Sequence, residues 1–232
     1  MNAGRSARER ARAELTREIA DEARRQLAKS GANGLSLRAV SRELGMVSSA
    51  LYRYFPTRDD LLTALILDAY GAVGDTAEAA DRADTDPTRR WYGVCAAIRT
   101  WALAHPHEYA LVYGSPVPGY RAPRSTVAQA ARVPLVLVGV VRDAWAAGVL
   151  TPPAARPPPG PVLSDQLRRL AASVAPELPG PVLSCVLIAW TQLFGMISFE
   201  LFGQLVGSVD PSDEFFANAT ARMAELVGLR PA

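Results

Sequence analysis

Hydroxyl, phenol and guanidinium groups gather in one short part of the chain, between residues 36 and 58. Ser48, Ser49, Tyr52 and Arg53 follow one another closely, and each can donate a hydrogen bond to a phosphate oxygen or a base edge. Few charges accompany them. Such residue types, held on a rigid support, favour contact with a nucleic acid.

The elements that must position these groups are two short helices. Apolar residues at helical spacing end at Leu44, and Gly45 then supplies a tight turn. Val47 and Leu51 resume the apolar stripe on a second helix, which is too short to be stable alone and must be held by packing. Two helices joined by a short turn with Gly form a helix-turn-helix, whose second helix lies in the DNA major groove.

Over about residues 10–70 the chain resembles the TetR family of transcriptional regulators. The residues that carry the resemblance are Ser36, Gly45, the run 51–55 (LYRYF) and the run 58–61 (RDDL). Ala50 departs from the family pattern, which often has Gly or Thr there, and Arg58 with Asp59 replaces Lys with Glu. The resemblance implies a three-helix DNA-binding head, a helical ligand-binding domain and a dimer on operator DNA.

Two kinds of DNA contact are expected from this segment. The start of a helix offers free N–H groups to an anion, which favours phosphate there. The predicted phosphate contacts are Ser36, Arg38, Tyr52 and Arg58. The predicted base-edge contacts are Ser48, Ser49, Ala50 and Arg53. Tyr54 either contacts DNA or packs with Phe55.

Charge is distributed unevenly along the chain. Residues 1–58 hold 12 basic and 6 acidic residues, whereas residues 59–232 hold 13 basic and 17 acidic ones. A basic head on an acidic body indicates a polyanionic partner at one end. We therefore predict a DNA-binding domain at 1–58 and a ligand-binding and dimerisation domain at 59–232. The basic arm with Arg5, Arg8, Arg10 and Arg12 is expected to be disordered without DNA.

The rest of the chain favours an all-α fold, since no strand pattern appears. Pro56 separates the recognition helix from a fourth helix that begins behind Thr57 and runs towards Ala83. Six prolines predict a loop at 151–161. The further helices are expected at about 87–104, from Pro106, at 125–148, up to about 175, at 181–207 and at 211–228.

The uncharged run 182–199 is close to the minimum length for a membrane span. It carries several polar residues and lacks basic anchors, so burial in protein is the better interpretation. One flank then requires a partner, and we predict a homodimer through residues 181–228. Cys95 and Cys185 lie far apart in apolar surroundings, and no secretory signal is seen. The predicted compartment is the cytoplasm, with no membrane association.

Aromatic residues concentrate in the middle of the chain, as in apolar pockets between helices. The spacing of Trp101, His105, Pro106, Tyr109 and Gly114 resembles a C-terminal domain of a TetR subgroup, which implies that an inducer binds there. The predicted ligand contacts are Trp101, His105, Tyr109, Tyr113, Trp145 and Phe194. The alternative is that these rings simply belong to the core.

Residues for catalysis are hard to find. His105 and His107 point in different directions on a helix start, and no Ser-His-Asp spacing, CxxC or glycine-rich phosphate loop is present. No catalytic residue, metal or cofactor is expected. The favoured function is a repressor released from operator DNA by a small apolar or aromatic effector. An architectural DNA-binding protein without a ligand and a helical enzyme remain alternatives.

Overall fold

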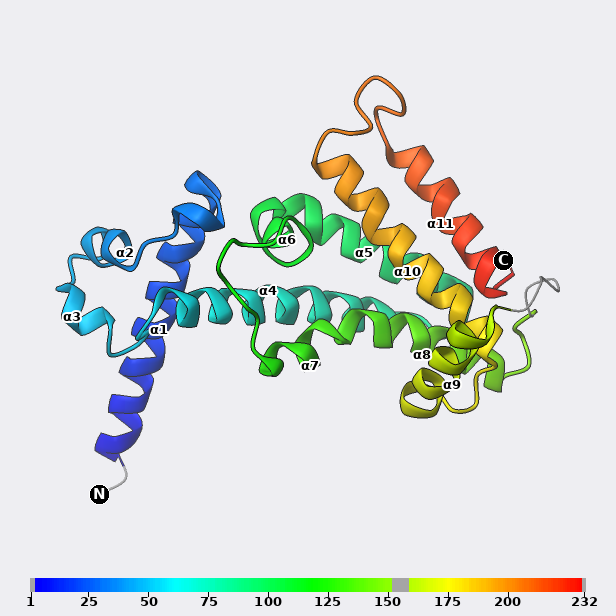
Figure 1. The fold of residues 1–232 in the computed structure, drawn as a ribbon, viewed down its shortest axis with the longest axis horizontal. Helices are drawn as coiled ribbons and strands as arrows, with labels where there is room; N and C mark the ends of the chain where they lie inside the picture. The colour runs from blue at the N-terminus through cyan, green and yellow to red at the C-terminus, as the bar shows by residue number, and fades with distance from the viewer. Residues whose placement is uncertain (1–2, 152–158, 231–232) are drawn as a thin grey trace. The chain divides into compact units, whose positions relative to one another are not determined.

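Wherever the structure describes the chain, its regular elements are helices. The structure is a computed structural model that describes residues 3–151 and 159–230, with side chains from residue 7 on. Most of the predicted loop at 151–161 falls outside these ranges. The long helices are α1 (Ala3–Ser30), α4 (Arg58–Asp81), α5 (Pro87–Ala104), α8 (Arg132–Ala146), α9 (Pro161–Val174), α10 (Gly180–Leu201) and α11 (Asp213–Val227) (Figure 1). The short ones are α2 (Leu37–Glu43), α3 (Ser48–Leu51), α6 (Pro106–Tyr113), α7 (Val127–Ala130) and the 3-10 helices η1 (Ala32–Gly34) and η2 (Arg124–Thr126). The predicted all-α fold is confirmed.

Contacts between residues divide the chain into two compact units. The first unit comprises Met1–Tyr70 and His105–Val127, and the second comprises Gly71–Ala104 and Ala128–Ala232. α4 contributes residues to both units, because the division falls within it. This division differs from the functional boundary predicted between residues 58 and 59, which stays a prediction.

An apolar core joins the N-terminal helices of the first unit. α1 buries Ile19 and Ala23 completely and Leu27 almost completely, as their spacing predicts. Leu51 of α3 is fully buried in this core, and burying a leucine contributes about 1.5–3 kcal/mol. That anchor explains why a four-residue helix persists here although a free helix so short is unstable. The remaining buried members are Ala20, Leu35, Leu37, Val40, Phe55, Leu61, Leu62, Leu65 and Ile66.

Local hydrogen bonds set the helix ends of the first unit where the sequence predicts them. The Ser36 hydroxyl accepts from the Ala39 N–H at 3.5 Å at the start of α2. At the start of α4, the Thr57 hydroxyl accepts from the Asp60 N–H at 3.1 Å, and the Asp60 carboxylate accepts from the Thr57 N–H at 2.9 Å. This reciprocal pair is a capping box. Gly45 makes its turn at φ 63°, in the left-handed region.

α10 is the central helix of the second unit. It contacts α5, α8 and α9, and it lies beside α11 (Figure 1). One face of α10 is buried and the opposite face exposes Ile188 and Phe199. The predicted end at Gly207 is wrong, because α10 stops at Leu201 and the following segment turns at Gly203 and Gly207, with φ 75° and 79°. The buried residues of α10 are Val182, Leu183, Cys185, Val186, Ala189, Leu193, Phe194 and Ile197.

The segment 125–148, predicted as one helix, is divided into η2, α7 and α8. Pro134 lies in the first turn of α8, where its missing N–H leaves no helical hydrogen bond unmade. A continuous helix through this position would lose that bond. The helical segment is instead interrupted at Ala131, about one turn before the proline, and the prediction of a single helix is wrong there.

Two arginines tie helices of the second unit together. Arg99 of α5 donates to Glu200 of α10 at 2.6 Å and pairs with Asp213 of α11 at 2.8 Å. The hydrogen bonds from Arg99 lower the pKa of Glu200. Arg132 of α8 donates to Glu78 of α4 at 2.7 Å. These contacts join helices that are far apart in the sequence.

Both cysteines are buried and neither forms a disulfide. Burial raises the pKa of the Cys95 thiol on α5 to about 12, which keeps it neutral. The helical stretch 124–146 and α10 are long and apolar enough to cross a membrane by length and composition alone. The core helix of a soluble protein passes the same test, and α10 packs against four helices as such a helix does.

Candidate nucleic-acid interface and ligand site

α2, the turn at Gly45 and α3 form the predicted helix-turn-helix. The Ser41 hydroxyl of α2 lies 3.1 Å from the Ser48 hydroxyl at the start of α3, in a hydrogen bond that joins the two helices. Across the turn, the Met46 N–H donates to the Ser41 carbonyl at 2.8 Å. α3 itself is a single turn, followed by further turns that reach Phe55. Ser48 is therefore engaged within the motif as well as placed at its surface.

We define the recognition segment as residues 47–54. The face that packing leaves free carries the predicted polar groups, with Ser49 and Arg53 exposed and the Tyr52 side chain 41% exposed. Arg38, in the first turn of α2, is exposed as well. The predicted contact residues that are half-buried are Ser36, Ser48, Ala50, Tyr54 and Arg58. The structure thus brings all nine predicted residues together in the first unit.

Arg12 of α1 has a role that the sequence did not reveal. Its guanidinium donates to the Arg53 carbonyl at 3.3 Å and lies over the Tyr54 ring, 5.2 Å from its centroid. α1 thereby holds the end of the recognition segment. α1 is helical from Ala3, so Arg8, Arg10 and Arg12 lie on this helix, and the disorder of the arm without DNA stays a prediction. No local pattern signals a contact between residues so far apart in the sequence.

Val47 is oriented differently from the prediction. The sequence pattern placed it on the inward stripe with Leu51, but its side chain is 70% exposed. Met46, one residue earlier, packs against the core of the first unit instead. The turn at Gly45 shifts the register of the inward positions by one residue, and the prediction is wrong for that reason. Val47 is also the N-cap of α3, with no hydrogen bond from its side chain.

Arg58 braces the backbone before α2. Its guanidinium donates to the Ala32 carbonyl at 2.7 Å and to the Leu35 carbonyl at 3.1 Å. Arg58 also forms an ion pair with Asp59 at 3.8 Å, and 32% of the Arg58 side chain is exposed. The charge can still reach an anion, but two of its donors already hold the chain that leads to Ser36.

The six predicted ligand contacts divide between the two units. His105, Tyr109 and Tyr113 belong to the first unit, and Trp101, Trp145 and Phe194 to the second. Tyr109, Trp101 and Phe194 are buried, Tyr113 and Trp145 are half-buried, and His105, which precedes α6, is exposed. The assignment of these side chains to a ligand stays a prediction.

Tyr109, Tyr113 and Phe194 take part in aromatic contacts. The Tyr113 ring lies 5.8 Å from that of Tyr70 and 5.1 Å from that of Tyr109, and burial raises the pKa of Tyr113. In the second unit, the Trp190 and Phe194 rings meet edge to face at 6.5 Å. Within the described structure, the buried indole N–H of Trp190 has no hydrogen-bond acceptor. This unpaired donor lies beside Phe194, one of the predicted ligand contacts.

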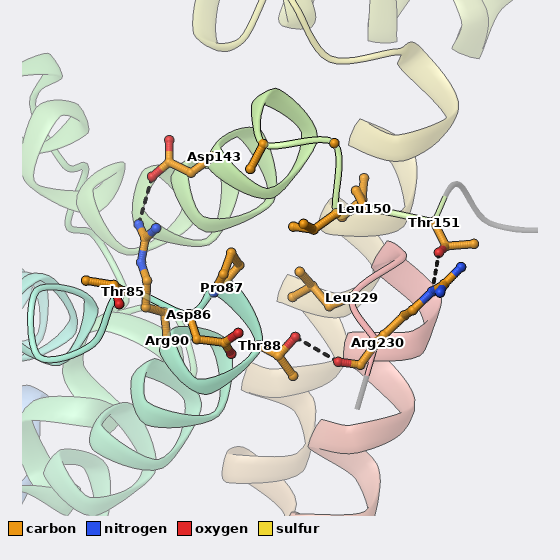
Figure 2. A pocket seen from close by; sticks show the side chains of 13 residues that line it. Thr85, Asp86, Pro87, Thr88, Arg90, Asp143, Leu150, Thr151, Leu229 and Arg230 are labelled. Atoms are coloured by element: carbon orange, nitrogen blue, oxygen red, sulfur yellow. Dashed lines mark hydrogen bonds and ion pairs between the residues drawn. The ribbon is translucent and has the colours of Figure 1, made fainter. Parts of the chain in front are cut away.

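A cleft in the second unit has a volume of about 980 Å³, and the side chains that line it are drawn in Figure 2. Both of its arginines are hydrogen-bonded, since Arg90 donates to the Asp143 carboxylate at 2.9 Å and Arg230 donates to the Thr151 hydroxyl at 2.7 Å. The Thr88 hydroxyl donates to the Arg230 carbonyl at 2.8 Å. None of the six predicted ligand residues lines this cleft. Its mixed polar and apolar lining, in which both arginines are already hydrogen-bonded, differs from the mostly apolar lining expected of an effector pocket.

The side chains of the described residues give no indication of a metal-binding site. No group of three or more His, Cys, Asp or Glu side chains there could hold a metal ion. The geometry of the first unit instead presents hydroxyl, phenol and guanidinium groups on a rigid segment. Such a surface can bind phosphates and base edges.

Comparisons with known proteins agree with that geometry at both ends of the chain. Residues 19–65 match the sequence model of bacterial regulatory proteins of the tetR family, and residues 91–223 match that of a tetracyclin repressor-like C-terminal domain. The HTH-type transcriptional regulator Rv1816 from Mycobacterium tuberculosis is 41% identical over 230 residues, covering 93% of this chain and 94% of the relative.

Solved structures show the same fold. The regulatory protein SCO4313 is 35% identical with a TM-score of 0.78, covering 94% of this chain and 98% of that one. FadR from Bacillus subtilis, solved in complex with stearoyl-CoA, is 13% identical with a TM-score of 0.57, covering 92% of this chain and 98% of that one. The second likeness concerns the fold alone.

Proposed function

Because the chain belongs to the TetR family of transcriptional regulators, we propose that it is a cytoplasmic, dimeric repressor that a small apolar or aromatic ligand releases from operator DNA. It is a regulator and not an enzyme. Residues 1–58 are proposed as the DNA-binding domain and residues 59–232 as the ligand-binding and dimerisation domain. The observation that carries the proposal is the recognition segment, which is anchored by fully buried Leu51 and exposes Ser49, Tyr52 and Arg53.

The proposed DNA contacts follow from this segment and from the start of α2. Ser36 and Arg38 lie at a helix start, where backbone N–H groups favour a phosphate. Tyr52 and Arg58 add phosphate contacts, which position the protein without reading sequence. The proposed base-edge contacts are Ser48, Ser49, Ala50 and Arg53, and Tyr54 supports the segment through Arg12.

The dimer is proposed to form through residues 181–228, in α10 and α11. The exposed face of α10 carries Ile188 at 47%, Phe199 at 56% and, just beyond its end, Phe202 at 47% exposure. Phe215 on α11 is 39% exposed. Large apolar side chains gathered on one pair of helices favour an interface between protein chains. A two-fold dimer also fits half-sites about 34–36 Å apart.

The ligand is proposed to contact Trp101, His105, Tyr109, Tyr113, Trp145 and Phe194, in a C-terminal domain of the subgroup that the spacing from Trp101 to Gly114 resembles. Apolar rings with few polar groups suit an apolar or aromatic molecule. The Trp190 N–H is an added donor for an acceptor atom on that ligand. The ligand releases DNA only if it binds more tightly to the conformation that cannot hold both half-sites.

A mobility-shift assay with DNA from the protein's own promoter region tests the proposal. Specific binding that a candidate aromatic or acyl effector releases supports it. Binding that no effector changes and that is equally strong on random DNA indicates an architectural protein instead. If the protein binds no DNA, both the repressor and the architectural protein are contradicted. Arg53→Ala is the matched variant, and it should lose discrimination between promoter and random DNA. Arg169→Ala, an exposed arginine of α9, should bind as wild type.

A further inference from the structure

The side chain of Val47 contributes little to folding, although its carbonyl accepts from the Ala50 N–H at 2.9 Å. It is the N-cap of α3, where Ser, Thr, Asp and Asn are strongly preferred, and its side chain makes no cap hydrogen bond. Its side chain is 70% exposed, so it adds little to the core. The neighbouring inward positions are filled by Met46 and Leu51. An apolar side chain at this site therefore favours neither the start of the helix nor its packing.

The position is nevertheless within the recognition segment, immediately before Ser48 and Ser49. Residues at the N-terminal end of a recognition helix are the ones that contact base edges in helix-turn-helix proteins. An isopropyl group has no hydrogen-bond donor or acceptor, so it cannot read the polar atoms of a base pair. The apolar feature that the major groove offers is the C5-methyl group of thymine.

We propose that Val47 contacts the C5-methyl group of a thymine in each operator half-site and is a specificity-determining residue. This inference rests on the proposed function, since it requires specific binding to duplex DNA. The contact of Val47 with the thymine adds to the proposed polar contacts with base edges and does not replace them. Serine at this position would cap α3 but would present a hydroxyl instead of an apolar group to the same methyl group.

Replacement of thymine by deoxyuridine removes only the methyl group and leaves base pairing and charge unchanged, which makes it the matched probe. An operator is first enriched from a random duplex library with the full-length protein. Each thymine is then replaced by deoxyuridine at symmetric positions in both half-sites, and dissociation constants are measured by fluorescence anisotropy. The scan is run with the wild type and with Val47→Ala.

At one thymine, replacement by deoxyuridine should lower the affinity of the wild type about fourfold per half-site. This is the effect expected when one methyl-sized group is removed from an apolar contact. Val47→Ala should lose less than about twofold at the same thymine. Because the contact carries no charge, Val47→Ala should keep the wild-type slope of affinity against salt. Val47→Ser should be equally insensitive to deoxyuridine while raising the melting temperature through its restored cap.

Val162→Ala is the control, because Val162 is 72% exposed on α9 in the second unit. It should respond to deoxyuridine as the wild type does. If the wild type and Val47→Ala respond alike at every thymine of a tightly bound operator, the inference is overturned and the proposed function stands. If no sequence is enriched at all, the proposed function fails and the inference fails with it.

Discussion

The guanidinium of Arg58 donates to the carbonyls of Ala32 and Leu35, so this side chain supports the approach to α2 before any DNA is bound. A direct phosphate contact and this bracing role predict different consequences of substitution. The charge governs the salt dependence of DNA binding, and the fork of donors governs the stability of the first unit.

We expect Arg58→Ala to weaken binding to operator and random DNA alike. The slope of log affinity against log salt should become shallower by about 0.9, the share of one phosphate. Loss of two charge-assisted hydrogen bonds should also lower the free energy of unfolding by about 1–2 kcal/mol, given that the side chain is partly exposed. Arg58→Lys should restore the slope but not the stability. Wild-type affinity of Arg58→Ala at several salt concentrations would contradict the phosphate contact.

Glu200 gives a pH-dependent prediction at the same scale. Hydrogen bonds from Arg99 lower its pKa below the ordinary value of 4.5, so the folded state favours the charged carboxylate. Its stabilising effect is present above pH 4.5 and is lost as the pH falls through the lowered pKa. The melting temperature of Glu200→Gln, followed by circular dichroism, should therefore fall less steeply below pH 4.5 than that of the wild type. Glu18→Gln, at an exposed position in the interior of α1, should track the wild type. Parallel curves for Glu200→Gln and wild type would refute this account.

Residues whose structure depends on near neighbours were predictable from the sequence. Ser36 and Gly45 do what their chemistry and local position require. Val47 was misplaced because the register of inward positions after a turn depends on packing, which the pattern does not contain. Arg12 was misjudged for a similar reason, since its partners lie more than 40 residues away on the chain.

At the scale of elements, the packing of Arg132 of α8 against α4 depends on two glycines of α4. Arg132 of α8 donates to the Gly71 carbonyl at 3.1 Å and pairs with Asp75 and Glu78 of the same helix. A Cβ at Gly74 would lie 2.9 Å from the Arg132 guanidinium carbon, whereas a Cβ at Gly71 would meet nothing within 4 Å. The absence of a side chain at Gly74 is what lets the guanidinium lie against α4.

We expect Gly71→Ala to stabilise the protein by about 0.5–1 kcal/mol, since alanine is favoured over glycine inside a helix. Gly74→Ala has the same gain in helix propensity but displaces Arg132 from its carboxylates. Its free energy of unfolding should therefore fall below that of Gly71→Ala by about 1 kcal/mol or more. Chemical denaturation of the two variants measures the difference. Equal stabilisation by both substitutions would show that the Arg132 contacts contribute nothing.

Helix boundaries were predictable where proline or a cap determined them, and α5 begins and ends as its pattern predicts. They were not predictable where continued apolar residues suggested more helix than forms. The sequence after Leu201 remains apolar, but Gly203 and Gly207 take left-handed conformations that a hydrophobic pattern does not reveal. Pro134 is an exception among the prolines, because the apolar run around it predicted a helix from residue 125 whereas α8 begins at Arg132.

At the scale of the whole molecule, the proposed dimer makes a direct prediction. Phe199 is 56% exposed on α10, and Phe199→Glu places a charge within the proposed two-fold interface. Two symmetric carboxylates in an apolar contact should make the variant monomeric at micromolar concentration, as seen by equilibrium sedimentation. Operator affinity should fall with it, because each head then binds its half-site alone. Val162→Glu, on α9, should remain dimeric. A dimeric Phe199→Glu protein would exclude this interface.

The fold class and the DNA-binding motif were more predictable from the sequence than the ligand-binding residues were. The head motif and the all-helical pattern rest on local periodicity, and both are confirmed. The predicted ligand residues are harder to assign, because a buried ring has the same sequence signature in a pocket as in a core. Their distribution over two units is a property of the folded chain that spacing alone does not encode.

The burial of both native thiols has a practical consequence for measuring how effectors act. Cys95 and Cys185 are buried away from solvent, and the neutral Cys95 thiol is a poor nucleophile. A maleimide reagent should therefore react with neither cysteine. A single new cysteine on the exposed side of α1, such as Ala28→Cys, then becomes the one labelled position in each protomer. Spin labels attached there would allow pulsed electron resonance to record the spacing of the two heads in the native protein, with and without a candidate inducer.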